Sequence, residues 1–206
     1  MSEKPDPTYE EEQALLELKR EIRSKVRVRR RESDPDWIIK ASERIQRGVM
    51  QQKEYQAAKT VGCYQALPYE VQTHKCIEEC RKQGRQICIP AYNEEQKRYE
   101  LIWMRENDPM INGRWNIPEP KQRELAGLMD VDCIIVPAVA YDRHGGRLGH
   151  GGGHYDRMLG AWSGFKIGVA FDFQVLDTVP QGSQDIPVDL VITETHMYTP
   201  DGPVEF

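Results

Sequence analysis

The sequence has no apolar run that approaches the roughly 20 residues needed to cross a membrane. Its charged N-terminal residues contain no hydrophobic segment of the kind found in secretory signal peptides. The cysteines number five, which is odd, and only Cys76 and Cys80 have the i, i+4 spacing of a helical metal pair, with no second pair to complete a site. These absences argue against a membrane protein, a secreted disulfide scaffold and a zinc module. They predict a cytoplasmic protein with reduced thiols.

Positive charge is not in excess either. The chain has 28 lysine and arginine residues against 33 aspartate and glutamate residues, for a net charge of -5. This balance argues against a general binder of nucleic acids or anionic membranes, so neither is an expected partner. At 206 residues the chain is long enough for one well-buried domain and short for two. We predict a single domain over residues 9–206 behind a flexible lead-in over residues 1–8, in a monomer or weak homo-oligomer.

The first long periodic segment combines an apolar stripe with many cations. Over residues 9–31 apolar side chains recur at helical spacing, at Leu15, Leu18, Ile22 and Val26. Eight lysine and arginine residues lie between positions 19 and 31, and Lys19, Arg23 and Arg27 share one face. Like charges at this spacing repel by a few tenths of a kcal/mol per pair, which a nearby anion would relieve. A solvated basic face and a phosphate-binding face are equally supported by this helix alone.

The rest of the chain alternates strands and helices. A second helix is predicted over about 37–50, with Ile38, Ile39, Ile45 and Val49 facing the core, and further helical segments end near residues 58 and 83. Buried strands are predicted at 60–66, 86–90, 99–104, 133–136, 166–171 and, as the last, 188–193. The second and third of these form an antiparallel hairpin, and residues 112–120 are expected to be loop. The pattern predicts a three-layer α/β/α domain with a mostly parallel sheet and N-terminal helices.

A glycine-rich stretch at residues 142–157 follows one of these strands directly. It holds six of the sixteen glycines of the chain, and residues 155–160 after it are compatible with a helix. A strand, a glycine loop and a helix start together predict an anion site, because backbone N–H groups can approach the anion closely. Arg147 can pair with a phosphate, and Asp156 can hold a Mg²⁺ ion that accompanies a polyphosphate.

Two standard phosphate-binding fingerprints are missing from this loop. A dinucleotide loop would need glycine at position 154, where this sequence has His154, and no Gly-Lys-Ser/Thr follows as in a P-loop. A plain turn is the alternative interpretation. The arginine, the aspartate and the flanking strand and helix favour phosphate binding over that alternative.

Four blocks in order give the chain a resemblance to the 5-formyltetrahydrofolate cyclo-ligase family, also called methenyltetrahydrofolate synthetases. They are Lys19-x-x-x-Arg23, residues 64–73 with Glu70, residues 115–120, and residues 136–156; a weaker fifth block spans 168–189. The resemblance extends over about residues 15–193, and the segment 147–156 is its most specific part. It implies a single α/β domain that converts 5-formyltetrahydrofolate and MgATP into 5,10-methenyltetrahydrofolate, ADP and phosphate.

The resemblance also implies roles for individual residues. Arg147 and Tyr155 are the expected catalytic residues, and Asp156 and Asp189 the expected Mg²⁺ ligands. The expected ATP contacts are Lys19, Arg23, Arg147, Leu148, Gly149, His150, Gly151, Gly152, Gly153, His154 and Tyr155. The expected folate contacts are Gln65, Glu70, Trp115, Gly151, Gly152, Gly153 and His154. A carboxylate such as Glu70 suits a pterin because it can accept two parallel N–H bonds, and Tyr155 and Trp115 are the expected packing partners of the pterin and formyl group.

Some residues depart from the family pattern. His154 stands where many members have tyrosine, His150 occupies a position that is often basic or aromatic, and Gln65 replaces an apolar residue found in some relatives. The two histidines could also be plain exposed loop residues. Two other functions stay open at this stage: a repurposed homologue that binds a different phosphorylated ligand, and an RNA or polyanion binder that uses the basic first helix.

Overall fold

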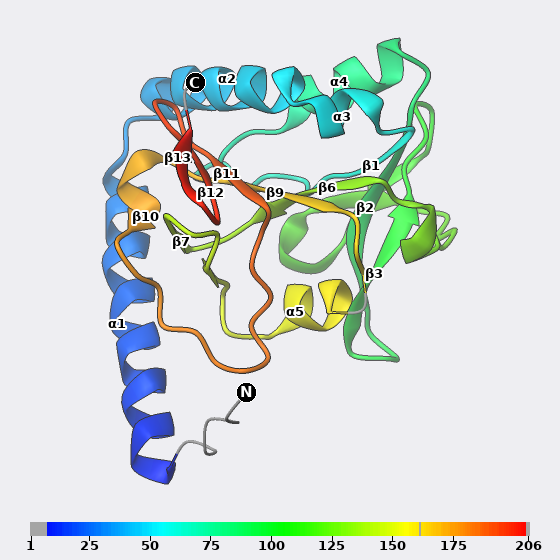
Figure 1. Cartoon of the computed structure of the whole chain (residues 1–206). Helices are drawn as coiled ribbons and strands as arrows, with labels where there is room; N and C mark the ends of the chain where they lie inside the picture. Colours follow the sequence, from blue (N-terminus) through cyan, green and yellow to red (C-terminus); the bar gives the residue numbers. More distant parts are fainter. Residues whose placement is uncertain (1–7, 161, 205–206) are drawn as a thin grey trace.

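The protein forms a layered structure around one large sheet, as the computed structural model in Figure 1 shows for residues 8–160 and 162–204. The predicted lead-in lies outside the described residues except for Thr8, which caps the first helix. The helices are α1 (Tyr9–Glu32), α2 (Pro35–Gln51), α3 (Lys53–Ala57), α4 (His74–Lys82) and α5 (His154–Leu159).

The large sheet has eight strands in the order β13-β12-β11-β9-β6-β1-β2-β3. Their bounds are β1 (Thr60–Gly62), β2 (Gln86–Asn93), β3 (Arg98–Trp103), β6 (Cys133–Pro137), β9 (Phe165–Val169), β11 (Leu190–Ile192), β12 (Met197–Thr199) and β13 (Gly202–Val204). The five central strands, from β11 to β2, pair in parallel. Antiparallel strands close both edges, including the predicted hairpin of β2 and β3.

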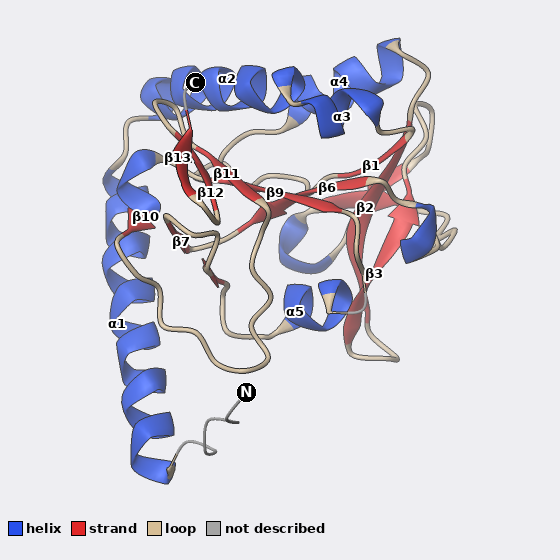
Figure 2. Cartoon of the chain, in the orientation of Figure 1, coloured by secondary structure: helices blue, strands red, loops and turns tan. Residues whose placement is uncertain are grey.

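Helices α2, α3 and α4 cover one face of this sheet, while α5 lies on the other face beside β3 (Figure 2). The two faces have separate apolar clusters: Ile45 and Val49 of α2 pack with one, and Leu159 of α5 packs with the other. The predicted three-layer α/β/α class is therefore confirmed. All five cysteines are buried free thiols, and burial raises their pKa values. In the described part of the chain, no helix is both long and apolar enough to span a bilayer.

Helix α1 begins where a capping box predicts. The Thr8 side chain accepts a hydrogen bond from the Glu11 backbone, and the Glu11 carboxylate accepts one from the Thr8 backbone. Acidic residues in its first turn and arginines in its last turn also complement the helix dipole. The predicted core stripes were each wrong at one position. Leu18 of α1 is 48% exposed and Ile39 of α2 is 50% exposed, because each lies at the edge of its apolar stripe.

The glycine-rich stretch lies between strand β6 and helix α5, as predicted, but it is not one continuous loop. A second sheet intervenes, with strands in the order β10-β7-β8. Strands β7 (Ala140–Asp142) and β8 (Arg147–Leu148) form a hairpin whose turn contains Gly145 at φ +85°. Strand β10 (Val175–Leu176) pairs with β7 in parallel. The hairpin leaves only residues 149–153 as the loop before α5, which is shorter than the predicted glycine loop.

Three other segments differ from the predictions. The segment expected to be loop, 112–120, is strand at both ends, in a small antiparallel pair of β4 (Met110–Asn112) and β5 (Pro118–Pro120). Strand β1 stops at Gly62 instead of continuing to residue 66. Strands β12 and β13 follow the segment that was predicted to be the last strand. Each of these strands has three residues, too few to show a period of two in the sequence.

Candidate functional site

Glu70 lies in a tightly held loop at the carboxyl end of β1. Its carboxylate Oε2 accepts a hydrogen bond from the Leu67 backbone at 3.0 Å, and its side chain is largely buried. The Tyr64 hydroxyl donates to the Val71 carbonyl at 2.6 Å, and the Gln72 amide donates to the carbonyls of Leu67 and Glu70. These contacts orient the carboxylate before any ligand binds.

The second carboxylate oxygen of Glu70 faces two cationic or polar groups without a direct hydrogen bond to either. Arg30 of α1 lies 4.0 Å from this Oε1, and His150 Nε2 lies 3.8 Å away. Arg30 is itself buried and donates to the Ala138 carbonyl. Oε1 can therefore accept one N–H bond from a ligand. A second ligand N–H bond would go to Oε2, which would then accept from both the ligand and the Leu67 backbone.

Tyr155 joins Glu70 at the start of α5. Burial raises the pKa of the Tyr155 phenol well above its ordinary value, and the nearby charge of Glu70 raises it further. The phenol is therefore neutral and can donate a hydrogen bond. The Arg147 guanidinium lies 5.7 Å from the centre of the Tyr155 ring. The loop thus gathers an acceptor, a donor and a cation at one place.

Arg147 and Asp156 form a buried ion pair across the glycine loop. Arg147 is 3% exposed, and its guanidinium donates to Asp156 Oδ1. The backbone N–H of Ile186 donates to the same oxygen at 3.1 Å. The predicted phosphate-binding arginine and the predicted metal ligand are therefore partners of one another in this structure.

Helix α1 brings its cations to the same loop. Lys19 is buried against Asp185 in an ion pair, and Arg23 Nε donates to the Gly149 carbonyl at 2.8 Å. Burial lowers the pKa of Arg23. Gly151 adopts φ +100°, and a Cβ added there would lie 3.5 Å from the Arg23 guanidinium. The basic face is thus split: Lys19, Arg23 and Arg30 face the protein, while Arg27 is exposed.

Three predicted site residues have their own partners. Asp189, just before β11, accepts a hydrogen bond from the Lys166 backbone at 2.7 Å and pairs with the Lys166 ammonium at 3.1 Å. The Gln65 amide lies 3.2 Å from the Met104 sulfur. Trp115 is 69% exposed at φ +63°, with the Arg114 guanidinium 5.5 Å from its ring. None of these contacts involves Glu70, Arg147 or Asp156.

His154 belongs to an aromatic cluster. Its ring meets the edge of Tyr99 at 5.0 Å and of Tyr92 at 5.7 Å between centroids. Arg157 donates to its Nδ1 at 3.0 Å, so in the neutral ring the proton is on Nε2. Partial burial lowers the His154 pKa, and the charges of Arg157 and Arg114 lower it further. The ring is therefore neutral at pH 7 and can donate from Nε2.

Comparison with known proteins agrees with this arrangement. A model of the 5-formyltetrahydrofolate cyclo-ligase family matches residues 16–194, most of the chain. The chain belongs to this family. The predicted family and the prediction of a cyclo-ligase enzyme are thereby confirmed.

Individual relatives support the assignment. The 5-formyltetrahydrofolate cyclo-ligase of Escherichia coli K12 is 29% identical over 180 residues, which cover 84% of this chain and 98% of that protein. The Haemophilus influenzae protein of the same name is 31% identical over 142 residues, 66% of this chain and 75% of that protein. The solved structure of Aquifex aeolicus 5,10-methenyltetrahydrofolate synthetase superposes with a TM-score of 0.80 at 32% identity, covering 92% and 96%.

Four residues near the glycine loop could not be assigned a role from the sequence. Asp185, the partner of Lys19, lies in a segment without periodicity, so no pattern pointed to it. Arg30 was one of eight cations and could not be separated from its neighbours. Tyr92 and Tyr99 lie on β2 and β3, where aromatic residues are common, which indicates only that they belong to strands. Tertiary contacts alone identify all four.

Proposed function

We propose that the chain catalyses the ATP- and Mg²⁺-dependent cyclisation of 5-formyltetrahydrofolate to 5,10-methenyltetrahydrofolate, with release of ADP and phosphate. The observation that carries this proposal is the convergence of Glu70, Tyr155 and Arg147 beside the 149–153 loop, in a chain of the cyclo-ligase family. An oriented carboxylate next to a phosphate-compatible loop suits one ligand with a polar heterocycle and another with a polyphosphate.

In this proposal the ATP phosphates lie against the glycine loop and the cations around it. Lys19, Arg23 and Arg147 approach the loop from α1 and β8, and the residues from Leu148 to Tyr155 supply backbone donors. The cations already contact Asp185, the Gly149 carbonyl and Asp156. Nucleotide binding would therefore exchange these internal partners for phosphate oxygens, a substitution of one charge-assisted contact by another.

Glu70 would bind the pterin on the other side of the loop. Its orientation by Leu67 leaves Oε1 available to an N–H donor of the heterocycle. The neutral phenol of Tyr155 would donate toward the formyl oxygen, and Gln65, Trp115, His154 and Gly151, Gly152 and Gly153 would complete the folate contacts. Trp115 is exposed, so it would reach the folate from the rim of the site.

The residues fit a Mg²⁺ ion that arrives with the nucleotide. Mg²⁺ is usually bound by one or two carboxylates together with substrate phosphates and water. Within the described part of the chain, no cluster of three or more His, Cys, Asp or Glu side chains could hold a metal, so phosphates would complete the set. Asp156 would be the protein ligand, and Asp189 as a second ligand stays a prediction. Bound Mg²⁺ would neutralise charge on the phosphates during transfer.

The chemistry needs positioning more than a protein nucleophile. The formyl oxygen is a poor leaving group on an amide, so it would first accept the γ-phosphoryl group of ATP, releasing ADP. N10 would then attack the formyl carbon of the resulting imidate phosphate, lose its proton and expel inorganic phosphate. Arg147 would stabilise charge on the transferred group, and the Tyr155 hydroxyl would orient the formyl oxygen.

The deciding experiment is the appearance of the methenyltetrahydrofolate chromophore when the purified protein is mixed with 5-formyltetrahydrofolate, ATP and Mg²⁺. Parallel reactions lack one component each. We expect product only in the complete mixture. If a folded protein forms no product, the proposal is wrong, and a repurposed homologue becomes the better interpretation.

A further inference from the structure

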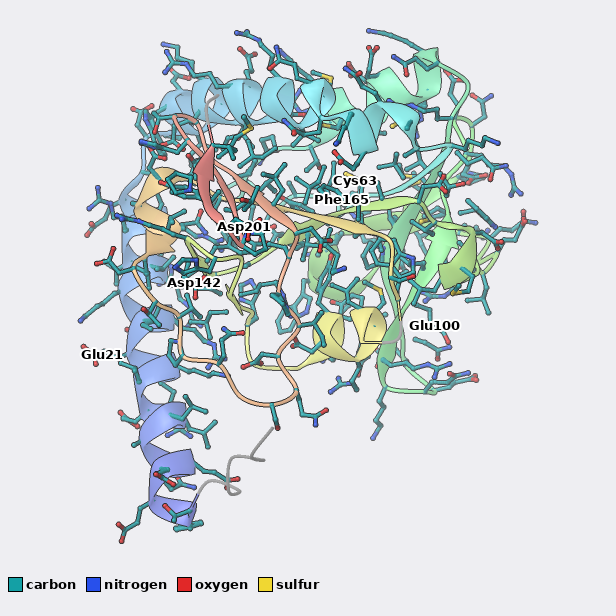
Figure 3. All side chains as sticks on the ribbon, in the orientation of Figure 1. Glu21, Cys63, Glu100, Asp142, Phe165 and Asp201 are labelled. Carbon is teal, nitrogen blue, oxygen red and sulfur yellow. The ribbon has the colours of Figure 1, made fainter. Side chains whose placement is uncertain are left out.

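Arg30 is a buried cation to which the proposed reaction gives no role. It is 6% exposed and lies near the end of α1. Lys19 and Arg23 lie on the same inward face of this helix, whereas Glu21 is exposed on the outward side, as Figure 3 shows. Arg30 therefore extends the row of inward-facing cations beyond the two that approach the glycine loop.

The contacts of Arg30 join segments that are distant in sequence. Its Nη2 donates to the Ala138 carbonyl, just after β6, and the Gln174 amide donates to the same oxygen at 3.3 Å. Its Nη1 lies 4.0 Å from Oε1 of Glu70, which is its one acidic partner among the described ion pairs. Its Nε is buried and has no hydrogen-bond partner within the described residues. The guanidinium is thus anchored to the end of a central strand and faces the Glu70 carboxylate.

The other described groups that face Glu70 do not supply a buried positive charge. Tyr64 and Tyr155 are buried phenols whose pKa values are raised well above the ordinary value, first by burial and then by the charge of Glu70, so both are neutral. His150, from the glycine loop, is 61% exposed on its side chain. Burial lowers the pKa of Arg30 and the charge of Glu70 raises it, but a guanidinium stays protonated at neutral pH. The field of Arg30 therefore favours an ionised carboxylate with Oε1 turned toward it.

We propose that Arg30 is a positioning residue, which keeps the Glu70 carboxylate ionised and fixes its direction. The inference rests on the proposed function, because Glu70 would bind the pterin. The Leu67 N–H holds Oε2, and Arg30 attracts Oε1 without a direct hydrogen bond, so that Oε1 can still accept one from a ligand. Arg30 acts through Glu70 and contacts no reacting atom. The helix that brings Lys19 and Arg23 to the glycine loop thereby also orients the acceptor on the other side of the loop.

A double-mutant cycle tests whether Arg30 acts through Glu70. The Kd of 5-formyltetrahydrofolate is measured by calorimetry without ATP for the full chain, for Arg30→Met, for Glu70→Gln and for the variant with both substitutions. We expect the Kd to rise about tenfold in Arg30→Met and about 30-fold in Glu70→Gln. The double variant should stay near the Glu70→Gln value, because a neutral amide no longer responds to the cation. A Kd raised about 300-fold in the double variant, the product of the two effects, would overturn the inference.

Two further variants separate the charge of Arg30 from its packing. Arg30→Lys keeps a cation, so its Kd should stay within about threefold of the wild-type value. Arg85→Met is a matched control, because Arg85 also donates to a backbone carbonyl, that of Tyr55, and also has a buried Nε without a partner among the described residues. Arg85 lies just before β2, at the opposite end of the sheet from Glu70, so Arg85→Met should leave the Kd unchanged. An equal loss in Arg30→Lys and Arg30→Met, or in Arg85→Met, would indicate a packing effect and overturn the inference.

Steady-state kinetics keeps this inference distinct from the proposed function. In an active enzyme, Arg30→Met should raise KM for 5-formyltetrahydrofolate about tenfold and leave kcat and KM for MgATP within about twofold of the wild-type values. A fall in kcat with an unchanged KM for the folate would overturn the inference, while the reaction itself would stand. If the wild type forms no methenyltetrahydrofolate but the cycle still shows that Arg30 and Glu70 are coupled in folate binding, the proposed reaction fails and the inference stands.

Discussion

The two sides of the glycine loop are prepared for ligands in different ways. On the proposed phosphate side, Lys19, Arg23 and Arg147 all contact acceptors from the protein itself. On the proposed folate side, Glu70 is held by the Leu67 backbone and leaves Oε1 without a hydrogen bond, 3.8 Å from His150 and 4.0 Å from Arg30. The cations on the first side are therefore paired within the protein, whereas the carboxylate on the second side has one oxygen available to a ligand.

This difference follows from the energetics of buried charge. A buried cation without a partner is strongly disfavoured, so three cations brought to one loop need acceptors when no anion is bound. A single carboxylate can be stabilised by one backbone donor and nearby cations while one oxygen stays free. We therefore expect ATP to compete with Asp185 and Asp156, and folate to bind a site that is already formed.

The largest effect is expected from a substitution that breaks the ion pair between Arg147 and Asp156. Arg147→Met should lower the free energy of unfolding by about 3 kcal/mol, because it leaves Asp156 partly buried without its cation. Urea denaturation of both proteins checks this. Adding Asp156→Asn to Arg147→Met should restore part of the stability, since the uncompensated charge is then removed. An unchanged stability in Arg147→Met would show that the pair is not an important part of the fold.

The next effect concerns the oriented acceptor. Glu70→Gln should raise KM for 5-formyltetrahydrofolate about 30-fold, equivalent to roughly 2 kcal/mol, because the amide loses the charge and one acceptor. KM for MgATP should change less than twofold. Initial rates at varied concentrations of each substrate provide both values. A similar increase in both KM values would mean that the two sides are not separate.

A smaller effect is expected when Lys19 loses its internal partner before MgATP binds. Asp185→Asn removes the charge that pairs with Lys19, so MgATP would no longer compete with it, and the Kd for MgATP should fall about threefold. Calorimetric titration with MgATP measures this. Glu21→Gln is a matched control, because Glu21 forms an exposed pair with Lys25 on the same helix. Weaker binding by Asp185→Asn would show that Asp185 positions Lys19 instead of competing for it.

The smallest effect is a shifted titration on the folate side. Because burial, Arg157 and Arg114 lower the His154 pKa, its ring should protonate in NMR titrations at a pH below that of an unstructured histidine. The unfolded chain then binds the proton more readily, so His154 lowers stability as pH falls through this window and not above it. Arg157→Gln should move the pKa upward, toward the ordinary value. An unmoved pKa in Arg157→Gln would exclude this arginine as a cause.

Much of the fold was predictable because its signals are local. The capping box at Thr8, the apolar stripe around Val26 and the β2 and β3 hairpin each involve residues close in sequence. Strands of two or three residues, such as β8 and β10, were missed because they are too short to have a period. Strand β8 depends on its hairpin with β7, and β10 depends on parallel pairing with β7 from much earlier in the chain.

The sequence by itself determined the family, the α/β layers and the glycine loop that carries Arg147, Tyr155 and Asp156. Local spacing and residue type are sufficient for these, because helix periods, buried strands and loop glycines leave a pattern in consecutive residues. Only the tertiary structure decided the partners: Lys19 with Asp185, Arg30 beside Glu70, and His154 against Tyr99. The physical reason is that a charge or ring is stabilised by whichever group the packed fold brings near it, and that group can be more than a hundred residues away.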